Sequence, residues 1–471
     1  MSAMDNSGEP QRGNSLLTGD LRRTLFFLAL PVLAEQFMNF FVGFVDTYLS
    51  GHATADPDFN RRATSAIGVA AYVGWLSSMM FGLVGVGTTA LVSRYWGAGD
   101  KQAANHIANR SMMLAVLLGI TACATFYFAA PLLATAVGMK KAVGMEGERY
   151  RIAVRYLQID AFGHMFHALS MIGAAALRGS GNTRSPMFIL GTVSLLNLIV
   201  SPLLVFGAGP VPALEIDGIV AGTVIARCCG GLLMLTVLSR GIRGLKLSLA
   251  EMKRGGDNSI RRILRIGLPA CADGAVLWMG HIVFLKIINS IGENAFAAHV
   301  IGIQAEAITY LPAIAWGIAA ATMTGQSLGN HNIPRARRAG HEAALQCSVL
   351  AGLISLFFVL GSEQIYQFMH TDPSVWKTGV FPFRFAGFFQ IPLGMSIIYM
   401  HSLRGAGDTR YPMLINLCGT FLVRVPGAYV CVVVLEWGLF GAWFAMCADI
   451  LLRAILLAVR HLRGRWVTTK V

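Results

Sequence analysis

The sequence predicts an all-α integral membrane protein with twelve transmembrane helices in two six-helix bundles related by pseudo-two-fold symmetry. Three observations lead to this fold class. The chain is 55% hydrophobic and only 13% charged, with a mean hydropathy of +0.59, whereas soluble proteins carry about 25% charged residues. Its apolar residues form runs of about 20 or more, the length that crosses a bilayer core about 30 Å thick. Segments of the first half recur, in order, in the second.

Each half contains six apolar spans, separated by short segments rich in Gly, Pro, Asn, Asp and Arg. In the first half they cover residues 25–49, 66–92, 107–132, 154–178, 186–207 and 217–239. In the second half they cover residues 263–290, 295–324, 341–362, 380–403, 411–435 and 438–460. We therefore expect a flexible cytoplasmic tail over residues 1–20, lobes over 21–240 and 263–462, a cytoplasmic linker over 241–262, and a second tail over 463–471.

The net charge of +14 is better explained by membrane orientation than by nucleic acid. The chain has no long basic block with interleaved aromatic residues. Most Lys and Arg outside the spans fall on one side of the membrane when both termini are cytoplasmic, as the positive-inside rule requires. The eight cysteines lie in apolar runs without metal-ligand spacing. We expect a multi-pass protein of a bacterial inner or plasma membrane, in contact with lipid, without nucleic-acid partners, and monomeric.

Internal repetition is the strongest organising signal. ALRGSGNTRSPM at 176–187 recurs as SLRGAGDTRYPM at 402–413, with eight of twelve positions identical. LALPVLAE at 28–35 aligns with IGLPACAD at 266–273, and GVGTTALVSRYWG at 85–97 aligns with GIAAATMTGQSLG at 317–329. Two same-sense halves joined by a cytoplasmic linker are typical of parallel transporter repeats with a site between the lobes.

The repeated segments 176–187 and 402–413 each contain a Gly-rich loop, RGSGNTR and RGAGDTR. These two Gly-rich loops allow two interpretations. Exposed N–H groups and nearby arginines could cradle a phosphate. The simpler interpretation is a tight turn permitted by glycine, with arginines that obey the positive-inside rule. We favour the second.

Carboxylates inside the apolar spans are candidate ion or substrate residues. Glu35, Asn39 and Asp46 fall on one stripe of the first helix, next to Gln36. An ionisable side chain at bilayer depth costs about 2.5 to 3.5 kcal/mol on insertion scales, so it usually faces a polar cavity. The repeat aligns Glu35 with Asp273. Structural alternatives are an interfacial or helix-capping role for Asp46, and pairing across the lobe interface for Glu35 and Asp273.

Other charged residues in the spans favour structural roles. Arg227 and Arg424 lie in apolar spans, so each needs a carboxylate or carbonyl partner, and we expect ion pairs. Asp160, His164 and His167 have the spacing of a metal or proton-relay face. Asp160 is close to the outer end of its span, which favours interfacial hydrogen bonding.

These motifs together resemble the multidrug and toxic compound extrusion (MATE) family, part of a wider group that includes polysaccharide and lipid-linked precursor exporters. The resemblance rests on LALP followed by VDTYLSGH, on the two Gly-rich loops, and on FAAHVIGIQAEAITYLPAIAWGIAAATMTGQSLGNH at 296–331. It implies a cleft alternately open to each side, and export of organic compounds against entry of H⁺ or Na⁺. It implies a transporter without enzymatic activity or a bound cofactor other than the coupling ion, and the chain has no G-x-x-x-x-G-K-[ST] nucleotide loop.

The resemblance also assigns positions. The family's first-helix acid corresponds to Asp46 and its fifth-helix polar residue to Asn197, which makes this pair a possible Na⁺ site. Some relatives carry an Asp four residues later, where this chain has Ser201. In the second lobe the candidates for cation or substrate contact are Asp273 and Glu306, with Gln304 and Tyr310 beside Glu306 on the same helix.

The sequence therefore predicts an antiporter that exports amphipathic, cationic organic compounds. One alternative is a flippase or exporter of a lipid-linked or anionic substrate, which would need a cleft rich in buried Arg and Lys. The other is a non-transporting scaffold or receptor, which the short loops and intramembrane carboxylates disfavour. Periodicity does not distinguish H⁺ from Na⁺ as the coupling ion, because both bind carboxylates.

Overall fold

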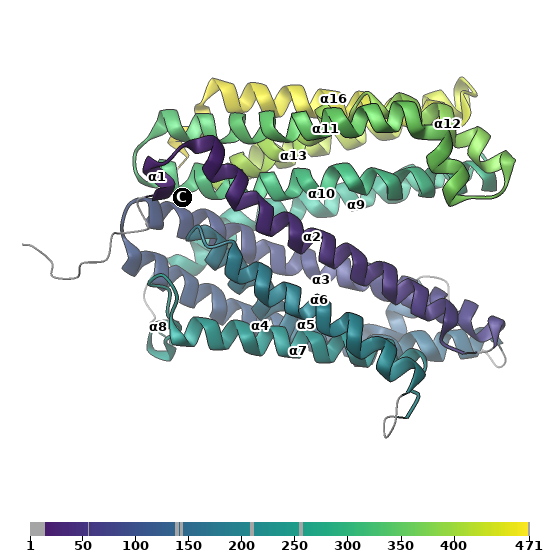
Figure 1. Ribbon diagram of the computed structural model, residues 1–471, viewed down its shortest axis with the longest axis horizontal. Coiled ribbons are helices and arrows are strands. Elements are labelled where there is room, and N and C mark those ends of the chain that lie inside the picture. Colours follow the sequence, from purple (N-terminus) through teal and green to yellow (C-terminus); the bar gives the residue numbers. More distant parts are fainter. Residues whose placement is uncertain are drawn as a thin grey trace, which may run out of the picture.

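The computed structural model describes residues 15–54, 56–136, 141, 145–207, 212–253 and 258–469, and long helices dominate it (Figure 1). Most of the predicted tail over 1–20, together with 254–257 of the predicted linker and the last two residues, lies outside the described part. The helices of the first half are α1 (Ser15–Thr18), α2 (Leu21–His52), α3 (Pro57–Gly97), α4 (Lys101–Ala136), α5 (Met145–Gly179), α6 (Arg184–Phe206), α7 (Ile216–Arg240) and α8 (Leu249–Lys253). Those of the second half are α9 (Ser259–Asn289), α10 (Glu293–Gly329), α11 (Ile333–Met369), α12 (Pro373–Gly387), α13 (Gln390–Gly405), α14 (Arg410–Cys418), η1 (Gly419–Arg424), α15 (Val425–Tyr429), η2 (Val430–Val434), α16 (Gly438–Arg463) and η3 (Arg465–Thr468).

The twelve predicted spans all correspond to helical segments of the structure. Ten described helical segments are long and apolar enough to cross a membrane, and α12 with α13 forms an eleventh, bent span. The remaining predicted span, 154–178, lies within α5. Arg155, Asp160 and two histidines make α5 more polar than the other spans.

Two predicted spans are not regular α-helices. The tenth bends by 57° between α12 and α13. Pro392, in the first turn of α13, has no N–H to donate to the carbonyl of Phe388 four residues earlier. The hydrogen bond that a regular helix would form across the break is therefore missing. The eleventh contains two π-helical segments, η1 and η2, on either side of α15, which holds Pro426. Such wide turns often lie near functional residues.

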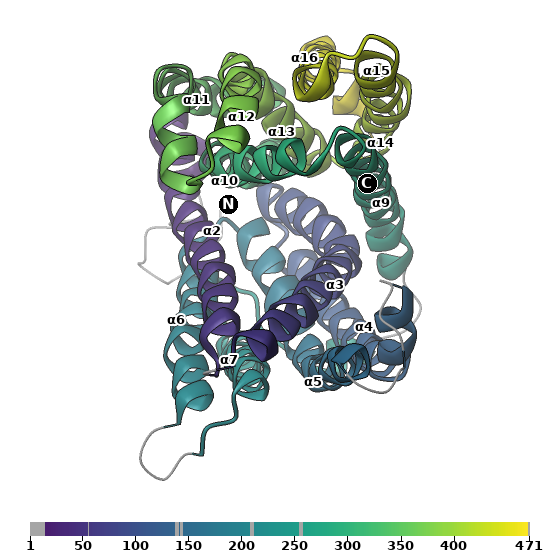
Figure 2. The same cartoon turned by 90° about the vertical axis from the view of Figure 1, so that its right-hand side faces the viewer.

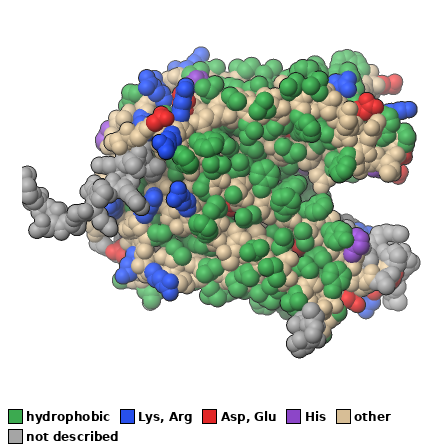
Figure 3. All heavy atoms as spheres, in the orientation of Figure 1, with side chains coloured by type: hydrophobic (Ala, Val, Ile, Leu, Met, Phe, Trp, Pro, Cys, Tyr) green, Lys and Arg blue, Asp and Glu red, His purple; other side chains and the backbone are tan. Residues whose placement is uncertain are grey.

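The helices form two bundles with a cleft between them. Helices α2–α7 lie in one bundle and α9–α16 in the other (Figures 1 and 2). The space-filling view shows a notch between the bundles at the end opposite α1 and the C-terminal segment (Figure 3). On this face, Lys and Arg gather mainly at the end that holds α1. The cleft is thus open at one end and closed at the end that holds α1 and the C-terminal segment η3.

The first helix of each half crosses to the other bundle at the closed end. Leu25, Leu28 and Val32 of α2 are buried in a core with Trp316 of α10. Reciprocally, the first turns of α9 add Ile263 to the core of the first bundle. The first turns of α2 and of α9 therefore each pack in the core of the opposite bundle, as expected for two halves related by a pseudo-two-fold axis.

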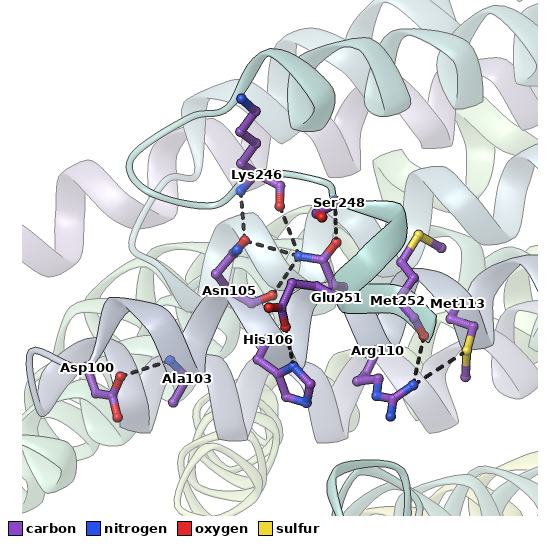
Figure 4. Close-up of polar contacts among 11 residues, drawn as sticks. Asp100, Ala103, Asn105, His106, Arg110, Met113, Lys246, Ser248, Glu251 and Met252 are labelled. Atoms are coloured by element: carbon purple, nitrogen blue, oxygen red, sulfur yellow. Dashed lines mark hydrogen bonds and ion pairs between the residues drawn. The ribbon is translucent and has the colours of Figure 1, made fainter. Parts of the chain in front are cut away.

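The segment that joins the two halves is docked against α4 (Figure 4). His106 Nδ1 lies 2.7 Å from Glu251 Oε2 in α8. Asn109 Nδ2 donates to the Lys246 carbonyl at 2.9 Å, and Arg110 Nη1 donates to the Met252 carbonyl at 2.7 Å. The described part of the predicted linker is thus attached to the first bundle.

Two glycines allow α3 and α10 to cross at the closed end. A Cβ atom on Gly97 would overlap the carbonyl oxygen of Gln326, and a Cβ on Gly329 would overlap that of Arg94. The repeat aligns Gly97 with Gly329 and Arg94 with Gln326, so the two contacts are related by the pseudo-two-fold axis. Only glycine permits this backbone contact, which closes the cleft at the terminal end.

We therefore predict that Gly329→Ala opens the closed end. The added methyl group collides with backbone on α3, which cannot rotate away, so the two bundles must separate there. Spin labels at positions 100 and 332, introduced into a chain with its native cysteines replaced, should report a longer mean distance. The control is Gly74→Ala on α3, where a Cβ meets no atom within 4 Å. An unchanged distance in Gly329→Ala would contradict the role of the crossing.

Candidate functional site

Two buried ion pairs occupy equivalent positions in the two bundles. Arg178 Nη2 donates to both carboxylate oxygens of Glu35, at 2.6 and 2.8 Å. Arg404 Nη2 donates to Asp273, whose oxygens also accept from Asn416 Nδ2 at 2.8 and 3.0 Å. Glu35 is 3% exposed and Asp273 is fully buried. Each pair joins the first long helix of its half to the helix that precedes the Gly-rich loop.

These contacts change the interpretation of the repeated loops. The repeat aligns Arg178 with Arg404, just as it aligns Glu35 with Asp273. The positive-inside rule does not describe arginines that are bound to buried carboxylates. The pairing also lies within each bundle rather than across the lobe interface. Opposite charges repeated at matching positions were the sequence signal that could have revealed both pairs.

The first bundle contains a second cluster around Asp160. Arg227 Nη1 donates to Asp160 Oδ1 at 2.7 Å, which confirms the ion pair expected of Arg227. His164 Nε2 lies 3.1 Å from Asp160 Oδ2. Asp160 is buried and has a cationic partner, so the structure shows it in an internal ion pair rather than at an exposed interface.

Asp46 lies beside this cluster, and within the described residues it forms no ion pair with an arginine of its own. Its surroundings include Arg227 and Asp160, which are close enough for their charges to act on it. Its Oδ1 atom is buried and has no hydrogen-bond partner among the described residues. Asp46 is in the interior of α2, six residues before the last one, so it does not cap the helix. It is therefore a partly buried carboxylate, and the arginine near it, Arg227, is already paired with Asp160.

The other first-lobe candidates make polar contacts around α6. Asn197 Nδ2 donates to Thr223 Oγ1 at 2.8 Å, while its Oδ1 is buried without a partner in the described part of the chain. Asn39 Oδ1 accepts from Ser194 Oγ at 3.4 Å, and Gln36 is partly buried. Carboxylate and amide oxygens are the ligands that a hard cation such as Na⁺ prefers. Among the described residues no group of three or more His, Cys, Asp and Glu could hold a metal ion.

In the second bundle Glu306 and Asp273 belong to different polar clusters. Glu306 Oε1 accepts from Gln390 Nε2 at 3.2 Å, at the bend between α12 and α13. Tyr310 lies close enough to Glu306 for the two side chains to interact electrostatically. Gln304, on the same helix, is exposed. Glu306 thus marks the bend of the tenth span, whereas Asp273 is part of the ion pair with Arg404.

A third cluster in the second bundle was missed at the sequence level. Asp449 is buried between Arg453, at 2.6 Å, and Arg424, at 2.8 Å, which confirms an ion pair for Arg424. Arg453 also donates to Asn416 Oδ1 at 3.3 Å and therefore joins this cluster to Asp273. Asp449 and Arg453 are four residues apart in an apolar span, a spacing that could have identified the pair.

A cavity of about 210 Å³ lies where the two bundles meet near the closed end. It is lined by Phe81, Gly82, Gly85, Val86, Thr89, Met171, Ala175, Arg178, Ile318, Ala321, His401, Arg404 and Gly405. The two arginines of the repeated ion pairs therefore face one chamber.

Comparison with known proteins agrees with this architecture. A family model described as MatE matches residues 31–203 and 269–430, more than half of the chain. The chain belongs to the MatE family. The resemblance inferred from LALP, VDT and the Gly-rich loops is confirmed, and members of this family are transporters.

Relatives of this MatE chain cover nearly its whole length. It is 29% identical to the probable multidrug resistance protein NorM of Thermotoga maritima, over 95% of this chain and 93% of that protein. It is 24% identical to a protein named FAD transporter from Shewanella oneidensis, over 88% of this chain and 90% of that one. A solved structure described as the outward-facing conformation of a multidrug resistance MATE family transporter superposes with a TM-score of 0.86. That structure is 20% identical, covering 98% of this chain and all of its own, and shows the same fold.

Loss of one member of a buried pair should destabilise this MatE protein more than loss of both. Glu35→Gln leaves the Arg178 charge buried without its carboxylate, and we expect a loss of about 3 to 5 kcal/mol. Combining Glu35→Gln with Arg178→Met should recover most of it. Thermal unfolding of the detergent-purified protein measures the effect. Glu342→Gln, which breaks the exposed pair with Arg22, is the control and should change little. A double variant no more stable than the single one would refute the pairing.

Proposed function

We propose that this protein is a secondary active antiporter that exports amphipathic organic compounds from the cytoplasm in exchange for H⁺ or Na⁺. The family and its multidrug-resistance relatives support a drug efflux transporter. Coupling to an ion, a cationic substrate, and action as a monomer are parts of the proposal. Asp46 is the observation that carries it, because its buried oxygen has no partner among the described residues and its neighbour Asp160 already binds Arg227.

The coupling step follows from the chemistry of an under-compensated carboxylate. Ionised Asp46 attracts a cationic substrate or Na⁺, whereas a bound proton removes that attraction and makes the side chain easier to bury. Each ligand shifts the conformational equilibrium only to the extent that it binds one state better. Asp46 lies on α2, whose first third packs in the second bundle. Repacking of α2 can therefore transmit the change at Asp46 to the contact between the bundles.

The direction of transport rests on orientation. The end that holds α1 and the C-terminal segment carries most of the Lys and Arg visible in Figure 3, which supports placing it in the cytoplasm. In that orientation the open notch faces outward, as in the outward-facing relative. Glu306, at the bend between α12 and α13, is the second-lobe carboxylate proposed to contact the cationic group of the substrate.

A second candidate function, export of anionic compounds, is favoured by one observation. The described residues that line the cavity at the closed end include Arg178, Arg404 and His401 and no acidic residue. The relative named as an FAD transporter is a precedent for a phosphate-bearing cargo.

Asp46→Asn tests the coupling. The variant keeps the shape of the side chain but cannot exchange a proton or carry negative charge, so ion-driven efflux should fall at least about tenfold. Inverted vesicles loaded with a fluorescent organic cation, under a proton gradient or a sodium gradient imposed separately, give the readout. The gradient that drives wild-type transport identifies the coupling ion.

The control for this test is Asp217→Asn. Asp217 is an acid of α7 that pairs with the exposed Arg155, and its loss should leave transport close to the wild-type rate. Full ion-driven efflux by Asp46→Asn, at wild-type expression, would overturn the assignment of coupling to Asp46.

A further inference from the structure

The chamber between the bundles combines apolar walls with arginine donors. Its polar side chains are Thr89, Arg178, His401 and Arg404, and none of the described residues that line it is acidic. Thr89 Oγ1 already donates to the Ala175 carbonyl at 3.1 Å. The groups left to meet a ligand are therefore the two guanidinium groups and the His401 imidazole.

Both guanidinium groups have hydrogen-bonding capacity to spare. Each uses only Nη2 to bind its carboxylate. Within the described residues, the hydrogen bonds of both guanidinium groups use Nη2, which leaves Nη1 without an acceptor. Their Nε atoms are buried, again without a partner in the described part of the chain. Both side chains are only 14% exposed. Buried donors of this kind normally find an acceptor, because leaving them unmet costs free energy.

We propose that this chamber is a subsite for an anionic group, a carboxylate, sulfonate or phosphate, carried by a transported compound with an apolar body. An acceptor oxygen of such a group can accept from the Nη1 donor that each arginine leaves free, and a hydrogen bond to a charged guanidinium is stronger than one between neutral groups. Phe81, Met171 and Ile318 form the apolar wall for the body of the compound. Glu35 and Asp273 balance the charges of the two arginines. Selectivity therefore arises from hydrogen-bond donors that face a largely apolar cavity, where such bonds are strong.

The subsite spans the two bundles. Arg178 comes from α5 of the first bundle, and Arg404 and His401 come from α13 of the second. A bound anion that accepts from both arginines connects the bundles at the end where the Gly97 and Gly329 contacts close the cleft. Release of the ligand toward that end requires those contacts to open. The inference rests on the second candidate function, export of anionic compounds, because it specifies where the anionic group of such a compound would bind.

Filling the chamber without touching the ion pairs tests the subsite. Gly82 lines the cavity, and a Cβ there meets no atom within 4 Å, so Gly82→Leu places a side chain in open space. Gly74→Leu is the matched control, since Gly74 lies on the same helix, also has open space, and does not line the cavity. Isothermal titration calorimetry on the purified full chain would use three probes of similar size: 1-naphthylacetate, 1-naphthaleneethanol and 1-naphthylmethylammonium.

We expect wild type to bind the anion at least about tenfold more tightly than the neutral or cationic probe, the discrimination that one charge-assisted hydrogen bond supports. Gly82→Leu should weaken anion binding at least about tenfold, and Gly74→Leu should not. The paired variant Asp273→Asn with Arg404→Gln, which removes one donor set together with its buried charge partner, should also weaken it. This second variant keeps the test valid should Gly82→Leu not fold.

Three results would overturn the inference: equal or tighter binding of the cationic probe, unchanged anion binding in both variants, or equally tight binding of inorganic phosphate alone. The last would show that the apolar body contributes nothing. The titration uses no ion gradient, so its failure leaves coupling at Asp46 standing. A failed Asp46→Asn efflux test would likewise leave the titration result standing.

Discussion

The interaction on which the rest of the structure depends is the buried carboxylate–arginine pair that occurs once in each bundle. A charge buried alone is very costly, and a charge buried with its partner is tolerated. Glu35 with Arg178 and Asp273 with Arg404 therefore fix the first long helix of each half against the helix before the Gly-rich loop. Because α2 and α9 each reach into the opposite bundle, these pairs also set where the two bundles meet.

The same symmetry makes the differences between the bundles informative. The repeat places Phe284 at the position of Asp46, and the guanidinium of Arg424 lies 5.9 Å from the Phe284 ring. Within the described residues, the first bundle thus has a carboxylate without its own arginine where the second has an aromatic ring beside Arg424, which pairs with Asp449. Asp46 therefore lies at a position where the two halves do not match. Ion coupling is accordingly proposed for the first bundle.

Closure of the cleft and access to the chamber both depend on the glycine-mediated crossing of α3 and α10. Gly97 and Gly329 allow α3 and α10 to contact each other through their backbones, and the chamber lined by Arg178 and Arg404 lies between those same helices and α5 and α13. Opening of the crossing would separate the two arginines. The conformational change and a ligand held between the arginines are therefore linked through the same few residues.

The sequence by itself determined the membrane class, the span positions, the duplication and the presence of carboxylates at bilayer depth. These depend on hydropathy and residue order, which are local properties. It predicted that Arg227 and Arg424 form ion pairs but not which residues are their partners. It did not anticipate the bend near Pro392 or the π-helical turns around Pro426. Only the tertiary structure decided that Arg178 binds Glu35, 143 positions away, and that no arginine in the described part of the chain pairs with Asp46. Pairing and cavity formation depend on distances between side chains remote in the chain, and periodicity along one helix contains no information about those distances.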